Sequence, residues 1–526
     1  MSLLHIKDLS LRIGQTQILH DIDLDLDAGE IVAITGESGS GKSMTALSIM
    51  GLLPHGSETT GTIQLAEADI MQTAESALCG MRGNTMGMVF QEPMTALNPV
   101  QTIGAQVAET ILIHEKTSKA DAHARAAAML ERVGLRVPPT RYPHQLSGGQ
   151  RQRVVIAMAI ALRPKLLIAD EPTTALDVTT QARILALLQD LVRAFDMGLL
   201  IITHDLAVVA DIADKIVVMQ NGRVVEAGAT DHLLQNMQHP YTKALFEASN
   251  HAVALPDADT EHRLLAVTDV ARDYPMARKS PLSARPMFRA LSDITFQINR
   301  GERVGLVGES GCGKSTLTRA ILGLEDVQHG AITLDGAPVF TDKRPNLTVR
   351  RKMQVVFQDP YSSFNPRHRV DRLITEPFHL LENPPTGAER DAAIVRALKD
   401  VGLSSADASK YIHEFSGGQR QRIAIARALI IEPALIIFDE AVSALDVSVR
   451  AQVLDLIADL CRKRPLAYLF ISHDLSVVRT ITDSVMVMQA GRIVEQGITD
   501  DVFTNPQHSY TKTLIAAAPQ LPKIAV

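Results

Sequence analysis

Two short segments of this 526-residue chain combine closely spaced glycines with a lysine and a serine. The first reads GESGSGKS at Gly36–Ser43, and the second reads GESGCGKS at Gly308–Ser315. Glycines in such a turn let backbone N–H groups surround an anion, and the N-terminus of a following helix stabilises negative charge. The lysine can then reach the β- and γ-phosphates of a nucleotide. The spacing therefore predicts two phosphate-binding loops.

We expect every residue of both segments to contribute to nucleotide binding. The first loop consists of Gly36, Glu37, Ser38, Gly39, Ser40, Gly41, Lys42 and Ser43. The second loop consists of Gly308, Glu309, Ser310, Gly311, Cys312, Gly313, Lys314 and Ser315. A thiol at a helix N-terminus can have a lowered pKa, but the position of Cys312 is a variable one in the motif, so we expect no catalytic role for it.

Two acidic pairs stand where apolar stretches end. They are Asp170 with Glu171 and Asp439 with Glu440. An aspartate at the end of a strand can hold the Mg²⁺ shell of a nucleotide, and the adjacent glutamate can polarise an attacking water. The serine hydroxyl that closes each glycine-rich loop is a further Mg²⁺ ligand. These residues predict hydrolysis of a nucleotide γ-phosphate with Mg²⁺.

A glutamine and a histidine accompany each acidic pair. Gln91 and Gln358 follow short apolar stretches in VFQEP and VFQDP, and His204 and His473 do so in THDL and SHDL. Such a glutamine can contact Mg²⁺ or the attacking water, and such a histidine can contact the γ-phosphate. The expected catalytic residues are therefore Gln91, Glu171, His204, Gln358, Glu440 and His473. The expected metal ligands are Ser43, Gln91, Asp170, Ser315, Gln358 and Asp439.

A third repeated motif reads LSGGQRQR at Leu146–Arg153 and FSGGQRQR at Phe415–Arg422. It precedes a helical pattern, so its backbone N–H groups can donate to an anion. It cannot face the phosphates of its own loop, because helical residues separate the two. We therefore expect it to complete a nucleotide site on another copy of the same motif set. The residues concerned are Ser147, Gly148, Gly149, Gln150, Ser416, Gly417, Gly418 and Gln419.

The motifs recur at a constant offset, which indicates duplication of a whole domain. The signature serines, the acidic pairs and the histidines are each 269 residues apart (416 − 147, 439 − 170 and 473 − 204). We predict a first domain over residues 1–250, a linker over 251–262 and a second domain over 263–526. The linker, HAVALPDADTEH, contains proline and acidic residues and has no periodicity.

Short apolar stretches that alternate with helical patterns predict an α/β fold with a mostly parallel sheet in each half. The expected strands are Ile31–Ile34, Leu166–Ala169, Leu199–Thr203, Val304–Val307, Leu435–Phe438 and Tyr468–Ser472. The expected helices are Lys42–Met50 and Lys314–Leu322, and longer helical stretches are expected over Ile103–Gly134 and Val370–Gly402.

The composition excludes several other classes of protein. A net charge of −7 and a pI near 6.2 give no electrostatic footprint for nucleic acid. Three isolated cysteines argue against a disulfide framework, a zinc site or an iron–sulfur cluster. No apolar stretch approaches the ~18 residues of a membrane span, and the N-terminus lacks a signal peptide. We therefore expect the chain to remain on the cytoplasmic side of a membrane.

The whole constellation resembles the ATP-binding cassette (ABC) ATPases. The resemblance implies two tandem ABC nucleotide-binding domains, each with a RecA-like parallel sheet core, a helical subdomain and an antiparallel β subdomain. It also implies that two ATP molecules are sandwiched head-to-tail, each between a phosphate loop of one half and the SGGQ segment of the other. Asp177 and Asp446, in the repeated ALD motif, resemble the family's residues that cross between the halves.

Two departures from the family's usual pattern matter. The family usually places an aromatic residue on the adenine ahead of the phosphate loop, and Tyr274 fits this role in the second half. The first half offers Ile13, so we expect weaker base stacking there. In the second half DEAVSALD replaces the usual DEPTSALD, which puts Ala441 where the first half has Pro172. Since the acidic pair is kept, we expect only a modest effect on the loop.

Further blocks are similar to ATPases of the oligopeptide, dipeptide and nickel import group. They are QEPMTALNPV and QDPYSSFNPR after each glutamine, and HPYTKAL and HSYTKTL near the end of each half. The resemblance implies a peripheral ATPase on the cytoplasmic face of the bacterial inner membrane that powers import of peptides or peptide-like compounds. Its implied partners are two integral-membrane permease subunits, docked on the helical stretch after each glutamine, and an extracytoplasmic solute-binding protein.

Other functions remain open at this point. A tandem-cassette translation factor bound to ribosomes shares every catalytic motif, but usually carries a long charged linker that this chain lacks. A fused sugar-importer ATPase often has one degraded site, whereas both sites here keep lysine, glutamine, glutamate and histidine. A module that only binds nucleotide would not need Glu171 and Glu440.

Overall fold

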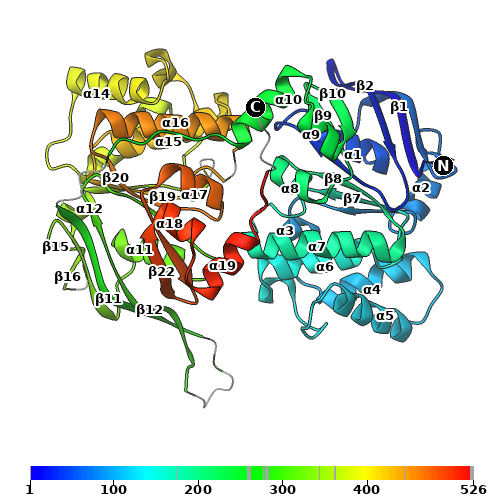
Figure 1. The fold of residues 1–526 in the computed structure, drawn as a ribbon, viewed down its shortest axis with the longest axis horizontal. Coiled ribbons are helices and arrows are strands. Elements are labelled where there is room, and N and C mark those ends of the chain that lie inside the picture. The colour runs from blue at the N-terminus through cyan, green and yellow to red at the C-terminus, as the bar shows by residue number, and fades with distance from the viewer. Residues whose placement is uncertain are drawn as a thin grey trace.

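The computed structural model describes the chain over residues 2–174, 176–257, 262–276, 278, 284–342, 344–359, 363–443 and 445–521. It consists of two halves that lie side by side, with matching elements in each (Figure 1). Residues 258–261 of the predicted linker lie outside the described residues.

Each half contains a six-stranded central sheet. The strand order in the first half is β10 (Arg223–Ala229), β9 (Lys215–Gln220), β3 (Ile31–Thr35), β8 (Gly198–Ile202), β7 (Leu166–Asp170) and β6 (Met86–Val89). The order in the second half is β18 (Met353–Val356), β19 (Leu435–Asp439), β20 (Ala467–Ile471), β13 (Arg303–Val307), β21 (Ser484–Gln489) and β22 (Arg492–Ile498). All neighbouring strands are parallel except the β9–β10 and β21–β22 pairs.

The central strands are apolar along their length because helices cover both faces of a parallel sheet. Every residue of β3, β7 and β8 is buried. A separate antiparallel sheet instead alternates buried and exposed residues along its first strand. It consists of β2 (Thr16–Leu26), β1 (Leu4–Ile13), β4 (Ser57–Leu65) and β5 (Ala68–Asp69) in the first half, and of β12 (Met287–Asn299), β11 (Arg263–Pro275), β14 (His329–Leu334) and β15 (Ala337–Pro338) in the second. A small hairpin pairs β16 (Phe340–Thr341) with β17 (Arg344–Pro345).

Helices surround both sheets. Those of the first half are α1 (Lys42–Met50), α2 (Glu75–Met81), α3 (Pro93–Ala96), α4 (Ile103–His114), α5 (Lys119–Arg132), α6 (Gly148–Ala159), α7 (Val178–Phe195), α8 (Leu206–Ile212), α9 (Thr230–Gln235) and α10 (Pro240–Ser249). Those of the second half are α11 (Lys314–Ile321), α12 (Leu347–Arg350), α13 (Val370–Ile374), α14 (Gly387–Asp400), α15 (Gly417–Leu429), α16 (Val447–Lys463), α17 (Leu475–Ile481), α18 (Thr499–Thr504) and α19 (Ser509–Ala516).

The two long helical stretches expected from the sequence are interrupted. In the first half Ser118 accepts a hydrogen bond from the N–H of Asp121 and so starts a new helix, α5. In the second half Pro377 lies in a short 3₁₀ segment, Glu376–Leu380, and Pro384 and Pro385 precede α14. Because proline removes a backbone donor and fixes φ, a single helix cannot pass through these residues.

Residues 251–257 lie against the second half rather than spanning free space. His251 Nε2 lies 2.8 Å from a carboxylate oxygen of Asp455 in α16. Val253 and Leu255 pack against the core of the second half, and Arg303 donates a hydrogen bond to the carbonyl of Pro256. This segment therefore fixes how the end of the first half meets the second.

Candidate nucleotide-binding sites

The topology brings the predicted chemical groups to one edge of each central sheet. Strand β8 lies between β3 and β7, and all three are parallel, so their carboxyl ends meet at the same edge. The first phosphate loop follows β3, Asp170 ends β7, and His204 follows β8. The second half repeats this order with β13, β19 and β20.

Glycine is required in the phosphate loops for a steric reason. Gly36 has a φ of 147°, and a Cβ there would lie 2.2 Å from the carbonyl oxygen of Met219. Gly308 has a φ of 153°, and a Cβ there would lie 2.2 Å from the carbonyl oxygen of Met488. No other residue type allows the loop to turn so closely against the neighbouring strand.

The lysine of each loop lies inside the turn. Lys42 Nζ donates to the carbonyl oxygens of Gly36 and Glu37, each at 2.8 Å. Lys314 Nζ makes the same two contacts in its loop, at 2.6 and 3.0 Å. Burial lowers the pKa of Lys42, while the nearby carboxylates, Glu171 foremost, oppose this shift. Each ammonium group thus lies buried within the turn of its loop.

Glu171 is the centre of the hydrogen-bond network in the first site. Its carboxylate accepts hydrogen bonds from Gln91 Nε2 and Thr174 Oγ1, both at 2.9 Å, and His204 Nδ1 lies 3.0 Å away. Burial alone raises the pKa of this carboxyl, but the bonds from His204 and Thr174 and the charge of His204 lower it to about 2. The glutamate is therefore ionised and held in one orientation.

The equivalent glutamate in the second site is held less closely. His473 Nδ1 lies 3.6 Å from the carboxylate of Glu440. Ser443, which corresponds to Thr174, donates to the backbone carbonyl of Glu440 at 2.9 Å instead of to its carboxylate. Burial raises the pKa of Glu440, and the nearby His473 outweighs this effect and lowers it.

Both glutamates adopt a backbone conformation that the sequence does not reveal. Their φ values are 46° for Glu171 and 51° for Glu440, in the left-handed region that non-glycine residues seldom occupy. The N–H of Glu171 donates to Ile202, and that of Glu440 donates to Ile471, each at 2.9 Å. This turn directs each glutamate side chain away from its strand and toward the phosphate loop.

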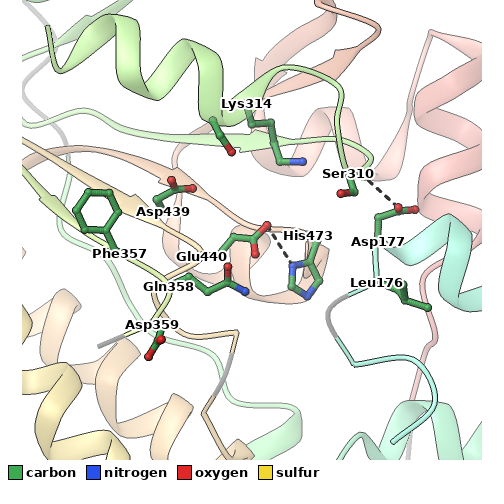
Figure 2. A pocket seen from close by; sticks show the side chains of 11 residues that line it. Leu176, Asp177, Ser310, Lys314, Phe357, Gln358, Asp359, Asp439, Glu440 and His473 are labelled. Carbon is green, nitrogen blue, oxygen red and sulfur yellow. Dashed lines mark hydrogen bonds and ion pairs between the residues drawn. The ribbon is translucent and has the colours of Figure 1, made fainter. Parts of the chain in front are cut away.

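A pocket in the second half gathers every predicted catalytic residue and metal ligand of that half (Figure 2). The second half supplies Ser310, Lys314, Ser315, Phe357, Gln358, Asp359, Asp439, Glu440 and His473. The first half supplies Leu176 and Asp177 on the opposite wall. The signature residues Ser147–Gln150 and the predicted base-stacking residue Tyr274 do not line this pocket.

Each phosphate loop forms a hydrogen bond with the other half. The N–H of Ser38 donates to Asp446 at 2.7 Å, and the N–H of Ser310 donates to Asp177 at 3.4 Å (Figure 2). Each loop is therefore bound by an aspartate of the other half, the reciprocal arrangement expected for Asp177 and Asp446.

Comparison with known proteins assigns the chain to a family. The ABC transporter family matches residues 19–174 and 291–443, and these two ranges include both phosphate loops and both acidic pairs. The chain belongs to the ABC transporter family of ATP-binding proteins. The C-terminal region of oligopeptide/dipeptide transporters also matches twice, at residues 225–265 and 494–525.

Relatives of this ABC protein align over nearly its full length. The peptidoglycan transport ATP-binding protein YejF of Agrobacterium fabrum is 45% identical over 98% of this chain and 96% of the relative. YejF of Escherichia coli, an ABC transporter ATP-binding protein, is 44% identical over 98% of this chain and 99% of the relative. The glutathione import ATP-binding protein GsiA of E. coli is 43% identical over 98% and 90%, respectively.

The signature segments of this ABC protein form capped helix starts. Ser147 Oγ accepts a hydrogen bond from the N–H of Gln150, whose side chain in turn accepts from the N–H of Ser147 at 3.0 Å. Ser416 and Gln419 repeat the arrangement at the start of α15. This capping box fixes the first turn of each helix, where free N–H groups favour an anion.

The residues beside Asp170 fit a magnesium ion. One carboxylate oxygen of Asp170, Oδ1, is buried and has no hydrogen-bond partner among the described residues. Burial raises the pKa of this carboxyl, and a hydrogen bond with Ser43 and the charge of Lys42 oppose the rise. A cation that binds oxygen ligands would satisfy the unpaired atom and stabilise the ionised form. No cluster of three or more histidine, cysteine or acidic side chains is found in the described ranges, so the fit depends on this serine–aspartate pair.

Tyr274 lies in β11, and a polar cluster surrounds it. Its hydroxyl donates to Glu325, and the guanidinium of Arg272 lies 5.0 Å from the ring centroid. Ile13 ends β1, the corresponding strand of the first half. An aromatic ring therefore stands at this position in the second half and an aliphatic side chain in the first, and the weaker base stacking expected in the first site stays a prediction.

Cys312 is buried in the second phosphate loop, and burial raises the pKa of its thiol. The thiol is therefore protonated near neutral pH. No helix in the described residues is long and apolar enough to cross a membrane.

Proposed function

We propose that this chain is the ATP-hydrolysing subunit of an ABC importer for peptides or peptide-like compounds. The duplicated C-terminal region of oligopeptide/dipeptide transporters carries this proposal, together with relatives named for glutathione import and peptidoglycan transport. Sugar import and ribosome binding lack comparable support. The first domain would cover residues 1–250, the linker 251–262 and the second domain 263–526.

Each half would supply one complete set of catalytic groups. Glu171 and Glu440 would accept a proton from, and orient, the water that attacks the γ-phosphate, since both carboxylates are ionised. Gln91 and Gln358 would position that water, and the histidines would hold the glutamates and contact the γ-phosphate. Mg²⁺, bound through Ser43 with Asp170 or Ser315 with Asp439, would supply charge neutralisation on the phosphates.

The phosphate-loop N–H groups and lysines would bind the triphosphate, and the SGGQ segment of the other half would close the site. ATP would then contact both halves, so that binding favours the closed arrangement. Loss of the γ-phosphate would remove the contacts that favour the closed arrangement of the two halves over the open one. This cycle would drive the permease between its two orientations.

The partners would be two integral-membrane permease subunits and an extracytoplasmic solute-binding protein. Exposed apolar side chains near Gln91 support a docking surface there. Met94 is 56% exposed, Val100 is 78% exposed, and Ile113 on α4 is 71% exposed. Apolar side chains grouped on a surface are typical of protein contacts. The chain would thus be held at the cytoplasmic face of the inner membrane through its permeases.

Purification of the tagged chain from membranes tests this function. We expect two membrane permeases to co-purify, and we expect a deletion strain to lose uptake of short peptides. Uptake should return with the wild-type chain and not with the Lys42→Ala, Lys314→Ala double variant. Co-purification with ribosomes, or normal peptide uptake in the deletion strain, would contradict the proposal.

A further inference from the structure

The two tail motifs, HPYTKAL and HSYTKTL, form the same local structure in both halves. The imidazole Nδ1 of His239 accepts the N–H of Tyr241 at 3.2 Å and so caps α10. His508 caps α19 through the N–H of Tyr510 at the same distance. This cap sets the direction in which each tyrosine leaves the first turn of its helix.

A carboxylate from the last strand of each central sheet fixes the turn before the helix. Glu226 in β10 accepts hydrogen bonds from the N–H groups of Gln238 and His239, at 2.7 and 3.2 Å. Glu495 in β22 accepts the equivalent pair at 2.7 and 3.0 Å. The tail is therefore anchored to the sheet immediately before the tyrosine.

Each tyrosine hydroxyl then reaches the phosphate loop of its own half. Tyr241 Oη accepts a hydrogen bond from the N–H of Glu37 at 3.0 Å. Tyr510 Oη accepts one from the N–H of Glu309 at 2.9 Å. Glu37 and Glu309 are the second residues of the two loops, directly after the glycine that approaches the neighbouring strand.

The same two glutamates contact the opposite half through their side chains. Glu309 Oε1 accepts a hydrogen bond from Thr179 Oγ1 at 2.6 Å, and the carboxylate of Glu37 accepts one from Ser448 Oγ. Thr179 lies in the first turn of α7, and Ser448 lies in the first turn of α16. One loop residue thus links its own tail to the other half of the protein.

The tail helices themselves pack across the boundary between the halves. Helix α10 lies against α16, and α19 lies against α7 (Figure 1). These are the helices that follow Asp446 and Asp177, the aspartates that bind the opposite phosphate loops. A movement of one half relative to the other must therefore change the environment of both tyrosines.

We propose that Tyr241 and Tyr510 are positioning residues that hold the phosphate loops in shape and couple loop geometry to contact between the halves. The proposal rests on the proposed function in that the loops bind ATP. The hydroxyl occupies the N–H of the second loop residue, and the opposite aspartate occupies that of the third, so the phosphates would bind nearer the helix start. Since both halves form this tyrosine–loop hydrogen bond from the same motif, each phosphate loop is held by the tail of its own half.

Nucleotide titration of the full-length chain tests the positioning role. Tyr241→Phe and Tyr510→Phe keep the ring and remove the acceptor, so we expect the KM for ATP and the Kd for MgADP to rise about tenfold, as for loss of one buried hydrogen bond. We expect kcat to change less than KM. Tyr468→Phe is the matched control, because Tyr468 is buried and its hydroxyl donates to the carbonyl of Ile481.

The control variant Tyr468→Phe should have a lower melting temperature than the wild type and an unchanged affinity for nucleotide. Tail variants that alter affinity no more than Tyr468→Phe would overturn the positioning role. A wild-type chain that binds no ATP would instead refute the proposed function. If the wild-type chain binds ATP and Tyr510→Phe binds it equally well, the positioning role of the tail is refuted and the proposed function is not.

A double-mutant cycle tests the coupling between the halves. We expect Tyr510→Phe and Thr179→Val to be non-additive in their effects on ATP affinity, because both act through Glu309. The pair Tyr241→Phe and Ser448→Ala should behave alike through Glu37. Additive effects in both cycles would overturn the coupling.

Discussion

The imidazole Nδ1 of His204 lies 3.0 Å from a carboxylate oxygen of Glu171. Burial lowers the pKa of His204, but its bond to the glutamate outweighs this and raises the pKa above the ordinary 6.5. The glutamate, with a pKa of about 2, is ionised throughout the neutral range. When His204 is protonated, the two groups form an ion pair at the end of β8.

This pair predicts a pH-dependent contribution to stability. Because the pKa of His204 is raised in the folded state, this residue stabilises the fold below its unfolded pKa of about 6.5. This contribution is lost as the pH rises through the folded pKa. Because the pKa of Glu171 is lowered in the folded state, this residue stabilises the fold above about pH 4.5, and its contribution is lost as the pH falls toward 2. The pair should thus be most effective between about pH 4.5 and 6.5.

Thermal unfolding across pH measures this contribution. We expect the wild-type chain to exceed Glu171→Gln in melting temperature most at pH 6, with a smaller difference at pH 8.5. His204→Gln, which cannot titrate, should remove the pH dependence of that difference. A difference that grows steadily from pH 6 to 8.5 would contradict the ion pair.

Removal of either proposed general base should stop turnover without removing nucleotide binding. Glu171→Gln and Glu440→Gln keep the size and hydrogen-bonding capacity of the side chain but cannot accept a proton. We expect each to lower ATP hydrolysis by the assembled transporter at least a hundredfold, as is typical for loss of a general base. The Kd for ATP should stay within about threefold, since neither glutamate belongs to a phosphate loop. Near wild-type turnover in one variant would make its site regulatory.

The aspartates that cross between the halves should differ in their effect on stability. Asp177 also accepts the N–H of Thr180 and caps α7, whereas the side chain of Asp446 makes no such cap. Asp177→Ala should therefore cost about 1 kcal/mol of unfolding free energy in addition to weakening contact with the second loop. Asp446→Ala should reduce cooperativity in ATP while changing stability little.

Denaturant unfolding and ATPase titrations separate the two effects. Equal losses of stability in both variants would refute the distinction. An unchanged ATP dependence in Asp446→Ala would mean that its bond to Ser38 does not contribute to communication between the sites.

The second site should depend on an aromatic ring that the first site lacks. Tyr274→Ala removes a ring that Arg272 and Glu325 hold in place, so we expect ATP to bind the second loop about five- to tenfold more weakly, in line with the energy of one aromatic stack. The measurement uses a Lys42→Ala background, which disables the first loop. Ile13→Ala in a Lys314→Ala background is the matched control and should have less effect. No change for Tyr274→Ala would exclude the stacking role.

Much of this organisation could be predicted because the repeated motifs are local. Helix α1 begins at Lys42 and ends at Met50, as the pattern after the glycine-rich turn predicts, and the strands before each acidic pair differ by one residue at most. The helical stretch before each signature motif was less predictable. Side-chain caps and prolines divide this stretch into shorter helices, and the spacing of apolar residues does not reveal where they do so.

The contacts of Gln91 and His204 with Glu171 could not be predicted, because they join residues from different loops. Gln91 and His204 follow strands other than β7, and they approach the carboxylate of Glu171 only after the sheet has formed. The looser contact at Glu440 is a difference in distance, 3.6 Å from His473 against 3.0 Å between His204 and Glu171, that the identical residue types do not predict. The tyrosines of the tail were visible as a repeated motif, but their contact with the phosphate loop arises only from tertiary packing.

The left-handed backbone at Glu171 and Glu440 has a consequence for how such duplicated proteins diverge. A non-glycine residue in this conformation costs about 1–3 kcal/mol, which the fold carries whether or not nucleotide is bound. Glycine adopts the same conformation at little cost, so glycine in place of either glutamate would relieve this backbone strain but would remove the carboxylate. Neither half of this chain has taken that step. Both copies therefore keep the strained glutamate, and with it the carboxylate that each proposed site would need for hydrolysis.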